Sequence, residues 1–278
     1  MNILLGCHTK NNAPDYLLGS VTEMLDYGAN CLMIYTGAPQ NSIRLPIEKM
    51  NIDAALSLLE KNNITPDKII IHAPYIINLA SDDISKQEFA REYLCKEIQR
   101  ANFIKAKYII VHPGNNVILE NGIQNIVTTL NYVLKHCNND VVILLENMSG
   151  RKNDIGASFD ELSSIIQKIT LKNRIGICFD TCHAFCYGYD IVEKYQEFKD
   201  HLRRLAIFKH IKVIHLNDSK INLGGKNDRH ANIGDGFIGL DALKKITYDI
   251  EFDVPKILET PYVNDLPPYK EEIKKLLS

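Results

Sequence analysis

This chain of 278 residues has no long apolar run, little net charge and no compositional break. No stretch approaches the ~18 to 20 uncharged apolar residues that cross a bilayer, and the opening residues MNILLGCH lack the basic and long apolar regions of a signal peptide. We therefore expect a cytoplasmic protein with no membrane partner. The chain also lacks linkers, low-complexity segments and blocks of like charge, which predicts one domain over residues 1–278.

The charge balance shows no basic excess. The sequence has 32 Lys and Arg against 34 Asp and Glu, a formal charge of −2, so bulk composition gives no sign of a nucleic-acid partner. Seven cysteines, an odd number mostly within predicted strands and helices, indicate reduced thiols rather than a disulfide framework. Cys178, Cys182 and Cys186 are separated by steps of four residues, which match neither a zinc knuckle nor a redox pair, so we assign them to packing.

What the sequence does contain is a series of short hydrophobic runs that each end on a side chain able to bind metal. They are KIIIH at His72, YIIVH at His112, VVILLE at Glu146, IGICFD at Asp180, KVIH at His215 and KILE at Glu259. With NILLGCH, which ends at His8, and CLMIY, which ends at Tyr35, the run ends are 27 to 44 residues apart, about one strand, one helix and two loops. Eight such units predict an α/β fold, the (β/α)8 TIM barrel, with the active site at the C-terminal ends of its strands.

Helical patterns fill the intervals between these runs. Ser85 with Glu88 and Ser158 with Glu161 form capping boxes that predict helix starts. The other predicted helices cover residues 15–29, 47–62, 119–137, 192–210, 239–247 and 268–277. Residues 217–239 are rich in glycine and asparagine and predict a long loop, and a loop of this length in a compact domain is usually functional.

Further metal-binding side chains follow the predicted strands. Asp228 and His230 lie two apart in the long loop, where an extended backbone would turn both to one face, and His183 follows Asp180 by about one helical turn. The nine candidate ligands are His72, His112, Glu146, Asp180, His183, His215, Asp228, His230 and Glu259. Zinc takes three or four such ligands, so this set with one bridging carboxylate suits three zinc ions, although Mn²⁺, Fe²⁺ and Co²⁺ accept the same ligand types.

The remaining histidines provide internal controls. His136, His201 and His210 lie in predicted helices, where we interpret them as surface or helix-end residues. His8 ends the first predicted strand but has no ion left to serve. We expect His8 to lie next to the metal ligands without binding an ion. It would then either hold a ligand or a water molecule in place or contribute only to packing.

Seven segments carry a family resemblance. HAPYIINLA, VHPG, LEN, FDTCHAF, HLNDSK, DRHANIGDG and ILETPY, in this order and spacing, resemble the endonuclease IV family of apurinic/apyrimidinic (AP) endonucleases, from residue 6 to near the C-terminus. The resemblance implies a xylose-isomerase-like barrel with three zinc ions at its mouth. It implies His72, His112 and Glu146 on the first ion, Glu146, Asp180, His215 and Glu259 on the second, and His183, Asp228 and His230 on the third.

The resemblance also implies a reaction. A hydrolase of this family cuts double-stranded DNA on the 5′ side of an abasic site during base excision repair, leaving a 3′ hydroxyl and a 5′ deoxyribose phosphate. Glu146, shared by two ions that acidify a water molecule, and Glu259, a candidate general base, are the catalytic residues we expect. Three Zn²⁺ ions would change the formal charge from −2 to about +4 and concentrate it at the cleft. The family implies a monomer.

Candidate DNA contacts follow from the same resemblance. Tyr75 and Ile76 match positions at which the family inserts side chains into the base stack beside the lesion. Some relatives carry an arginine wedge after the second strand, where this chain has Gln40, with Arg44 four residues later, and we retain both as candidates. The glycine-rich turns near Gln40 and at residues 234–239 could present backbone N–H groups to phosphates.

Two alternatives remain open on the sequence alone. A sugar isomerase or epimerase of the xylose-isomerase-like barrels would also place histidines and carboxylates at strand ends, but with one or two ions, leaving His183, Asp228 and His230 without a task. A non-catalytic lesion-binding barrel would be expected to have lost at least one ligand, and none of the nine is missing.

Overall fold

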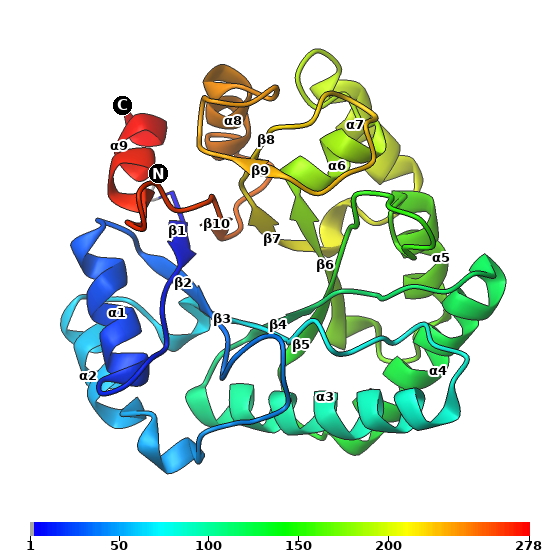
Figure 1. Cartoon of the computed structure of the whole chain (residues 1–278), viewed down its shortest axis with the longest axis horizontal. Coiled ribbons are helices and arrows are strands. Elements are labelled where there is room, and N and C mark those ends of the chain that lie inside the picture. Colours follow the sequence, from blue (N-terminus) through cyan, green and yellow to red (C-terminus); the bar gives the residue numbers. More distant parts are fainter. Residues whose placement is uncertain (1–2) are drawn as a thin grey trace.

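The computed structural model describes residues 3–278 and contains a closed barrel of eight parallel strands (Figure 1). These strands are β1 (Leu5–His8), β2 (Cys31–Ile34), β3 (Ile69–His72), β4 (Tyr108–Val111), β5 (Val142–Glu146), β6 (Ile175–Asp180), β7 (Ile211–His215) and β10 (Lys256–Leu258). Strands that follow one another in the chain are neighbours in the barrel, which closes by pairing β1 with β10. The predicted TIM barrel is confirmed, and every predicted run ends within one residue of an observed strand end.

Helices surround the strands (Figure 1). They are α1 (Tyr16–Asp26), α2 (Ile52–Lys61), α3 (Ile84–Ile104), α4 (Leu119–His136), α5 (Phe159–Lys168), α6 (Thr181–Tyr187), α7 (Tyr195–Arg204), α8 (Leu240–Thr247) and α9 (Tyr269–Leu277). Short 3₁₀ turns are η1 (Ile47–Lys49), η2 (Pro66–Lys68), η3 (Lys172–Arg174) and η4 (Phe208–His210). Within residues 3–278 no helix is both long and apolar enough to span a membrane.

Three helix predictions need correction. The predicted helix at 47–62 is divided into η1 and α2, and that at 192–210 into α7 and η4. The cap of α3 is Asp83, two residues before the predicted Ser85, because the Asp83 carboxylate accepts the N–H groups of Ser85 and Lys86 at 2.9 and 3.4 Å. Helix α6 was not predicted. The cap at Ser158 is confirmed, since its hydroxyl accepts the N–H of Glu161 at 3.1 Å.

The alternation of side chains along each strand separates two cores. One buried cluster contains residues from seven of the barrel strands and fills the interior: Cys31, Met33, Ile70, Ile110, Val142, Leu144, Cys178, Val213 and Ile257. The intervening strand residues, such as Ile69 and Ile71, face outward and pack with the helices in a larger cluster. Gly6 is required on the interior side of β1, because a Cβ there would lie 1.7 Å from the carbonyl oxygen of Cys31.

Candidate metal centre

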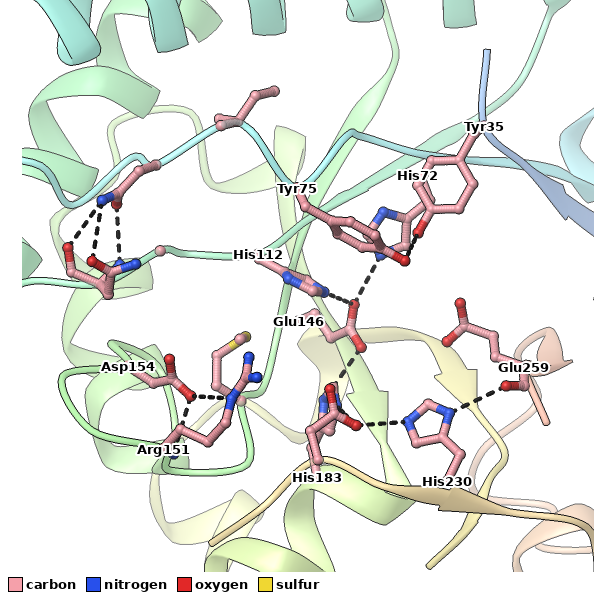
Figure 2. A pocket seen from close by; sticks show the side chains of 16 residues that line it. Tyr35, His72, Tyr75, His112, Glu146, Arg151, Asp154, His183, His230 and Glu259 are labelled. Carbon is pink, nitrogen blue, oxygen red and sulfur yellow. Dashed lines mark hydrogen bonds and ion pairs between the residues drawn. The ribbon is translucent and has the colours of Figure 1, made fainter. Parts of the chain in front are cut away.

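Each strand-end ligand lies two residues beyond an interior core residue. Ile70 precedes His72 in this way, Leu144 precedes Glu146 and Val213 precedes His215. Because side chains two apart share a face of a strand, the residue that follows the core layer must point into the barrel at its C-terminal mouth. The same relationship holds for Ile110 with His112, Cys178 with Asp180 and Ile257 with Glu259. The mouth opens as a cavity of about 430 Å³ (Figure 2).

The first ligand set gathers on one oxygen of Glu146. Nε2 of His72 lies 3.1 Å from Glu146 Oε2, and Nε2 of His112 lies 3.2 Å from the same oxygen. Possible ligand atoms of the three residues all lie within 4.8 Å of one another. The side chain of Glu146 is buried at the end of β5, so both imidazoles converge on a carboxylate that solvent barely reaches.

The second set uses the other oxygen of Glu146. Nδ1 of His215 lies 3.1 Å from Glu146 Oε1 and 2.8 Å from Glu259 Oε2, and 3.9 Å from Asp180 Oδ2. Their possible ligand atoms again lie within 4.8 Å of one another. Glu146 therefore connects the two sets geometrically, one oxygen to each, as a bridging carboxylate would.

The third set combines α6 with the long loop. Strands β8 (Asp218–Ser219) and β9 (His230–Ala231) pair antiparallel and bring the loop back across the mouth on the α6 side (Figure 1). Asp228 Oδ1 lies 3.3 Å from Nε2 of His183 and 3.4 Å from Nε2 of His230. The extended loop thus turns Asp228 and His230 to one side, as predicted, and the unpredicted helix α6 supplies their partner.

Backbone carbonyls orient three of the histidines. Nδ1 of His72 lies 2.7 Å from the carbonyl oxygen of Ala73, Nδ1 of His183 lies 2.9 Å from that of Asn147, and Nδ1 of His230 lies 3.2 Å from that of Glu259. A carbonyl oxygen only accepts, so in each pair Nδ1 donates, which leaves Nε2 as the nitrogen that a metal ion could take. Nε2 of His230 is buried without a hydrogen bond. These are the tautomers that a metal site requires.

Three carboxyl groups of the centre, those of Glu146, Glu259 and Asp228, have a lowered pKa, which favours their ionised form. Burial alone would raise the pKa of Glu146, but the rings of His215 and His112 outweigh burial and lower it well below its ordinary value. Burial likewise opposes the effect of His215 on Glu259, whose pKa falls to about 2. The pKa of Asp228 is also lowered, because His183 outweighs its burial. Ionised carboxylates beside oriented imidazoles form a donor set that suits Zn²⁺, so the residues present fit metal binding.

Two asparagines that sequence reasoning missed hold the ligands in place. The side-chain oxygen of Asn147 accepts the N–H of Asp180 at 2.8 Å, and its amide donates to the Asp180 carbonyl at 3.1 Å. Asn217 donates to Asp180 Oδ2 at 2.7 Å and accepts the N–H of Glu259 at 2.9 Å. Each asparagine lies one or two residues after a ligand, in the LEN and HLN segments, and that position was the available signal.

Cys182 also lies close to the candidate ligands. It lies in α6, and a possible ligand atom of Cys182 is within 4.8 Å of ligand atoms of Asp180 and His230. The neighbouring Cys186 and burial raise the pKa of its thiol, which keeps it protonated. Its Sγ lies 3.9 Å from that of Cys186, so packing describes this pair better than a thiolate site, in agreement with the prediction.

The remaining histidines are divided between the site and the surface. His8 belongs to none of the ligand sets, and its ring packs edge-on against Tyr35 with centroids 5.2 Å apart. Burial lowers the pKa of His8 although Glu259 acts in the opposite direction. The three controls lie elsewhere: His136 stacks on Tyr132, His201 contacts Asp160 and His210 contacts the Ile175 carbonyl.

Tyr75 lies exposed at the rim of the cavity (Figure 2). Its hydroxyl accepts a 2.7 Å hydrogen bond from Tyr35, its N–H donates to the Pro39 carbonyl, and its ring stacks near His112 with centroids 5.6 Å apart. Ile76 beside it is half-buried, and Gln40 is exposed.

The structure does not bring Arg44 to that rim. Its Nε donates to Glu97 Oε1 at 2.8 Å, and Nη1 donates to the carbonyls of Ala38, Asn41 and Ile43. The side chain is only 9% exposed. A guanidinium that closes its own loop is poorly placed to enter a base stack, which weighs against the expected DNA contact, and this contact of Arg44 stays a prediction.

The glycine-rich turn after β9 also differs from expectation. Its backbone N–H groups turn inward to the buried carboxylate of Asp218, which accepts from Gly234 at 3.0 Å, Gly236 at 3.1 Å and Ile238 at 2.9 Å. A Cβ on Gly236 would lie 2.4 Å from Asp218 Oδ1. These groups consequently shape the loop that carries Asp228 and His230, and they are not available to a phosphate.

Comparisons with known proteins agree with the geometry. The profile of the xylose isomerase-like TIM barrel family, AP endonuclease family 2, matches residues 21–278. A relative from Mycoplasmopsis agalactiae named probable endonuclease 4 is 45% identical, with 99% of this chain and 98% of the relative covered. The crystal structure of endonuclease IV from Thermus thermophilus superposes with a TM-score of 0.87 at 27% identity, with 98% of each chain covered. A D-tagatose 3-epimerase-like protein superposes with a TM-score of 0.71 at 23% identity, covering 99% of this chain and 97% of the other, and shares the fold.

Proposed function

Because the chain belongs to the endonuclease IV family, we propose that it hydrolyses the phosphodiester bond 5′ to an abasic site in double-stranded DNA, leaving a 3′ hydroxyl and a 5′ deoxyribose phosphate. Such a cut is a step of base excision repair. The observation that carries the proposal is the convergence of three ligand sets at the barrel mouth, two of them sharing Glu146, directly beside the exposed ring of Tyr75.

We assign three Zn²⁺ ions to these sets. His72, His112 and Glu146 would hold the first, Glu146, Asp180, His215 and Glu259 the second, and His183, Asp228 and His230 the third. When bound, the ions supply Lewis acidity that activates water and neutralises charge on the phosphate. The chain itself offers no serine, cysteine or lysine nucleophile among the described residues lining the cavity, which supports a reaction with water as the attacking group.

The protein residues position the reactants. Glu146 fixes the spacing of the first two sets, and the lowered pKa of Glu259 keeps its carboxylate ready to accept a hydrogen bond from the attacking water. Asn217 holds Asp180 and Glu259 through one amide. We propose that Tyr75, with Ile76 and Gln40, enters the DNA beside the lesion, because an exposed ring stacks on bases and restores the stacking that is broken when a sugar leaves the helix.

The sugar epimerase alternative rests on weaker support. The structural likeness at 23% identity shows a shared barrel and no more. An isomerase site with one or two ions leaves His183, Asp228 and His230 unexplained, although their two rings and one carboxylate converge as closely as the other sets do. The complete ligand set also weighs against a binding protein without activity.

The decisive experiment joins metal analysis with cleavage. Purified protein should contain close to three transition-metal ions per chain and should nick a duplex with one abasic site, giving a product whose 3′ hydroxyl primes a DNA polymerase without further processing. Chelation should abolish nicking while circular dichroism shows the barrel still folded. A single ion per chain, or an intact duplex after prolonged incubation with the metal-loaded protein, would refute the proposal. Gel filtration of the active protein tests the expected monomer.

A further inference from the structure

The cavity wall away from Glu259 carries an arginine that the metal sets do not use. Arg151, in the loop between β5 and α5, is the single Arg or Lys among the described residues that line the cavity. The same lining includes four carboxylates: Glu146, Asp154, Asp228 and Glu259. Figure 2 shows the side chain of Arg151 extending from its loop toward the space that Glu146 faces, on the other side of Glu146 from Glu259. Arg151 is thus a single guanidinium beside four carboxylates in this cavity, and none of the metal-ligand sets accounts for its presence.

The loop holds Arg151 firmly. The N–H of Arg151 donates to Asp154 Oδ2 at 3.1 Å, and the N–H of Asp154 donates back to the Arg151 carbonyl at 3.0 Å. Backbone hydrogen bonds then attach this loop to the one after β4: Asn116 donates to the Asn153 carbonyl and Ile155 to that of Gly114, both at 3.0 Å. Two loops of the mouth are thereby fixed together, and Arg151 is carried on a rigid support.

The guanidinium itself remains largely free. Its Nε lies 3.8 Å from Asp154 Oδ2, an ion-pair distance too long for a hydrogen bond, and the side chain is 53% exposed. Among residues 3–278 no acceptor takes a hydrogen bond from this guanidinium. Arg44 provides the contrast, since its Nε donates to Glu97 and its Nη1 donates to three carbonyls. Arg151 therefore presents a planar fork of unused donors, oriented along one edge by Asp154.

We infer that Arg151 binds a phosphate of the DNA backbone that flanks the bond to be cut. This inference rests on the proposed function. A guanidinium fork matches two phosphate oxygens, and such contacts fix the register of a protein on DNA. Arg151 belongs to none of the ligand sets, and we assign its contact to a phosphate that does not react. The interaction is then equally strong before and during the reaction, which predicts an effect on KM and not on kcat.

The test compares charge-matched variants of the metal-loaded protein on an abasic duplex. Arg151→Gln should raise KM about 5- to 20-fold and leave kcat within about twofold. The slope of log affinity against log salt, measured between about 50 and 200 mM KCl, should become shallower by about 0.9. Arg151→Lys keeps the charge without the fork, so it should retain the salt slope and show a smaller rise in KM. Lys152→Gln removes the same charge from the neighbouring exposed residue and should leave both quantities near wild type.

The outcomes are separable from those of the proposed function. Fluorescence anisotropy with the same duplex reports affinity whether or not the strand is cut. If the protein bound the duplex without cutting it, the proposed reaction would be refuted, but the effect of the Arg151 substitutions on DNA affinity could still be measured. An unchanged KM and salt slope in Arg151→Gln would overturn the inference. A fall in kcat at constant KM would also overturn it. So would an equal decrease of the salt slope in Lys152→Gln, because this result would indicate a general electrostatic attraction and not a specific contact of Arg151.

Discussion

The side-chain amide of Asn217 donates to Asp180 Oδ2 over 2.7 Å, and both side chains are fully buried. Asn217 comes from the segment after β7, whereas Asp180 ends β6, so this bond joins neighbouring loops of the barrel mouth. The second acceptor of the Asp180 carboxylate, Oδ1, takes the N–H of His183 at 2.6 Å. Asp180 is thereby oriented from both sides before any ion binds.

Asn217→Ala should therefore damage activity without removing a ligand. Loss of a residue that orients metal ligands typically costs 10- to 100-fold in metal affinity or rate, and we expect about that decrease in the nicking rate. Asn222→Ala, an exposed asparagine in the same loop, is the matched control. Wild-type nicking by Asn217→Ala with a full metal complement would show that the amide is dispensable.

Glu146→Ala should be more harmful than His72→Ala. Glu146 directs one oxygen to each of two ligand sets, whereas His72 contributes to one. Elemental analysis should show a larger loss of metal from the Glu146 variant, and its nicking rate should fall further, because in the proposed reaction both ions that activate the water would depend on Glu146. Near-normal nicking by Glu146→Ala would contradict the bridge.

Tyr75→Ala should weaken capture of abasic duplex about 5- to 150-fold, the loss expected for one base-stacking interaction. Tyr75→Phe keeps the ring and removes only the hydrogen bond with Tyr35, so it should lie near wild type. Because the wedge acts when DNA is unstacked, the defect of Tyr75→Ala should shrink on a duplex with mismatches flanking the lesion. Equal ratios of cleavage efficiency on the paired and mismatched substrates would mean that Tyr75 only packs over His112.

A stability prediction concerns Lys199, which is not part of the candidate metal centre. Its Nζ donates to Asp249 Oδ2 at 2.8 Å and to Glu251 Oε2 at 2.5 Å, and only 8% of its side chain is exposed. Lys199→Met leaves the Asp249 carboxylate without its cation, whereas Glu251 keeps its contact with Arg203. The substitution should lower the free energy of unfolding by about 2 kcal/mol at neutral pH. Lys194→Met, an exposed lysine at the start of the same helix, should change it little.

The pH dependence of that difference follows from Asp249. Burial would raise its pKa, but the hydrogen bond from Lys199 lowers it below the ordinary value. A lowered carboxyl pKa stabilises the fold above the unfolded value of about 3.9 and ceases to do so as pH falls through the folded pKa. The difference between wild type and Lys199→Met in denaturant melts should stay constant between about pH 5 and 8 and narrow below about pH 4. A difference that widened in acid would contradict the assignment.

The sequence by itself determined the barrel and the positions of its candidate metal ligands. Strand runs with a regular spacing fix the βα units, and the alternation of side chains along a strand makes His72, Glu146 or His215 point into the mouth once Ile70, Leu144 or Val213 fills the core. Both periodicities are local properties of the backbone. Both can be recognised in a single sequence because neither depends on contacts with residues far away in the chain.

Only the tertiary structure decided which polar groups meet. Arg44 was predicted to face DNA, yet Glu97, 53 residues away in the chain, takes its guanidinium. The N–H groups of the glycine-rich turn were predicted to face phosphates, yet Asp218 accepts them. Three further features were also absent from the sequence predictions and depend on contacts made in the fold: helix α6, the hydrogen bonds of Asn217 and the loop that supports Arg151. A buried donor must be satisfied by whatever acceptor the fold brings within about 3 Å, and that choice depends on three-dimensional distance, which local sequence patterns do not encode.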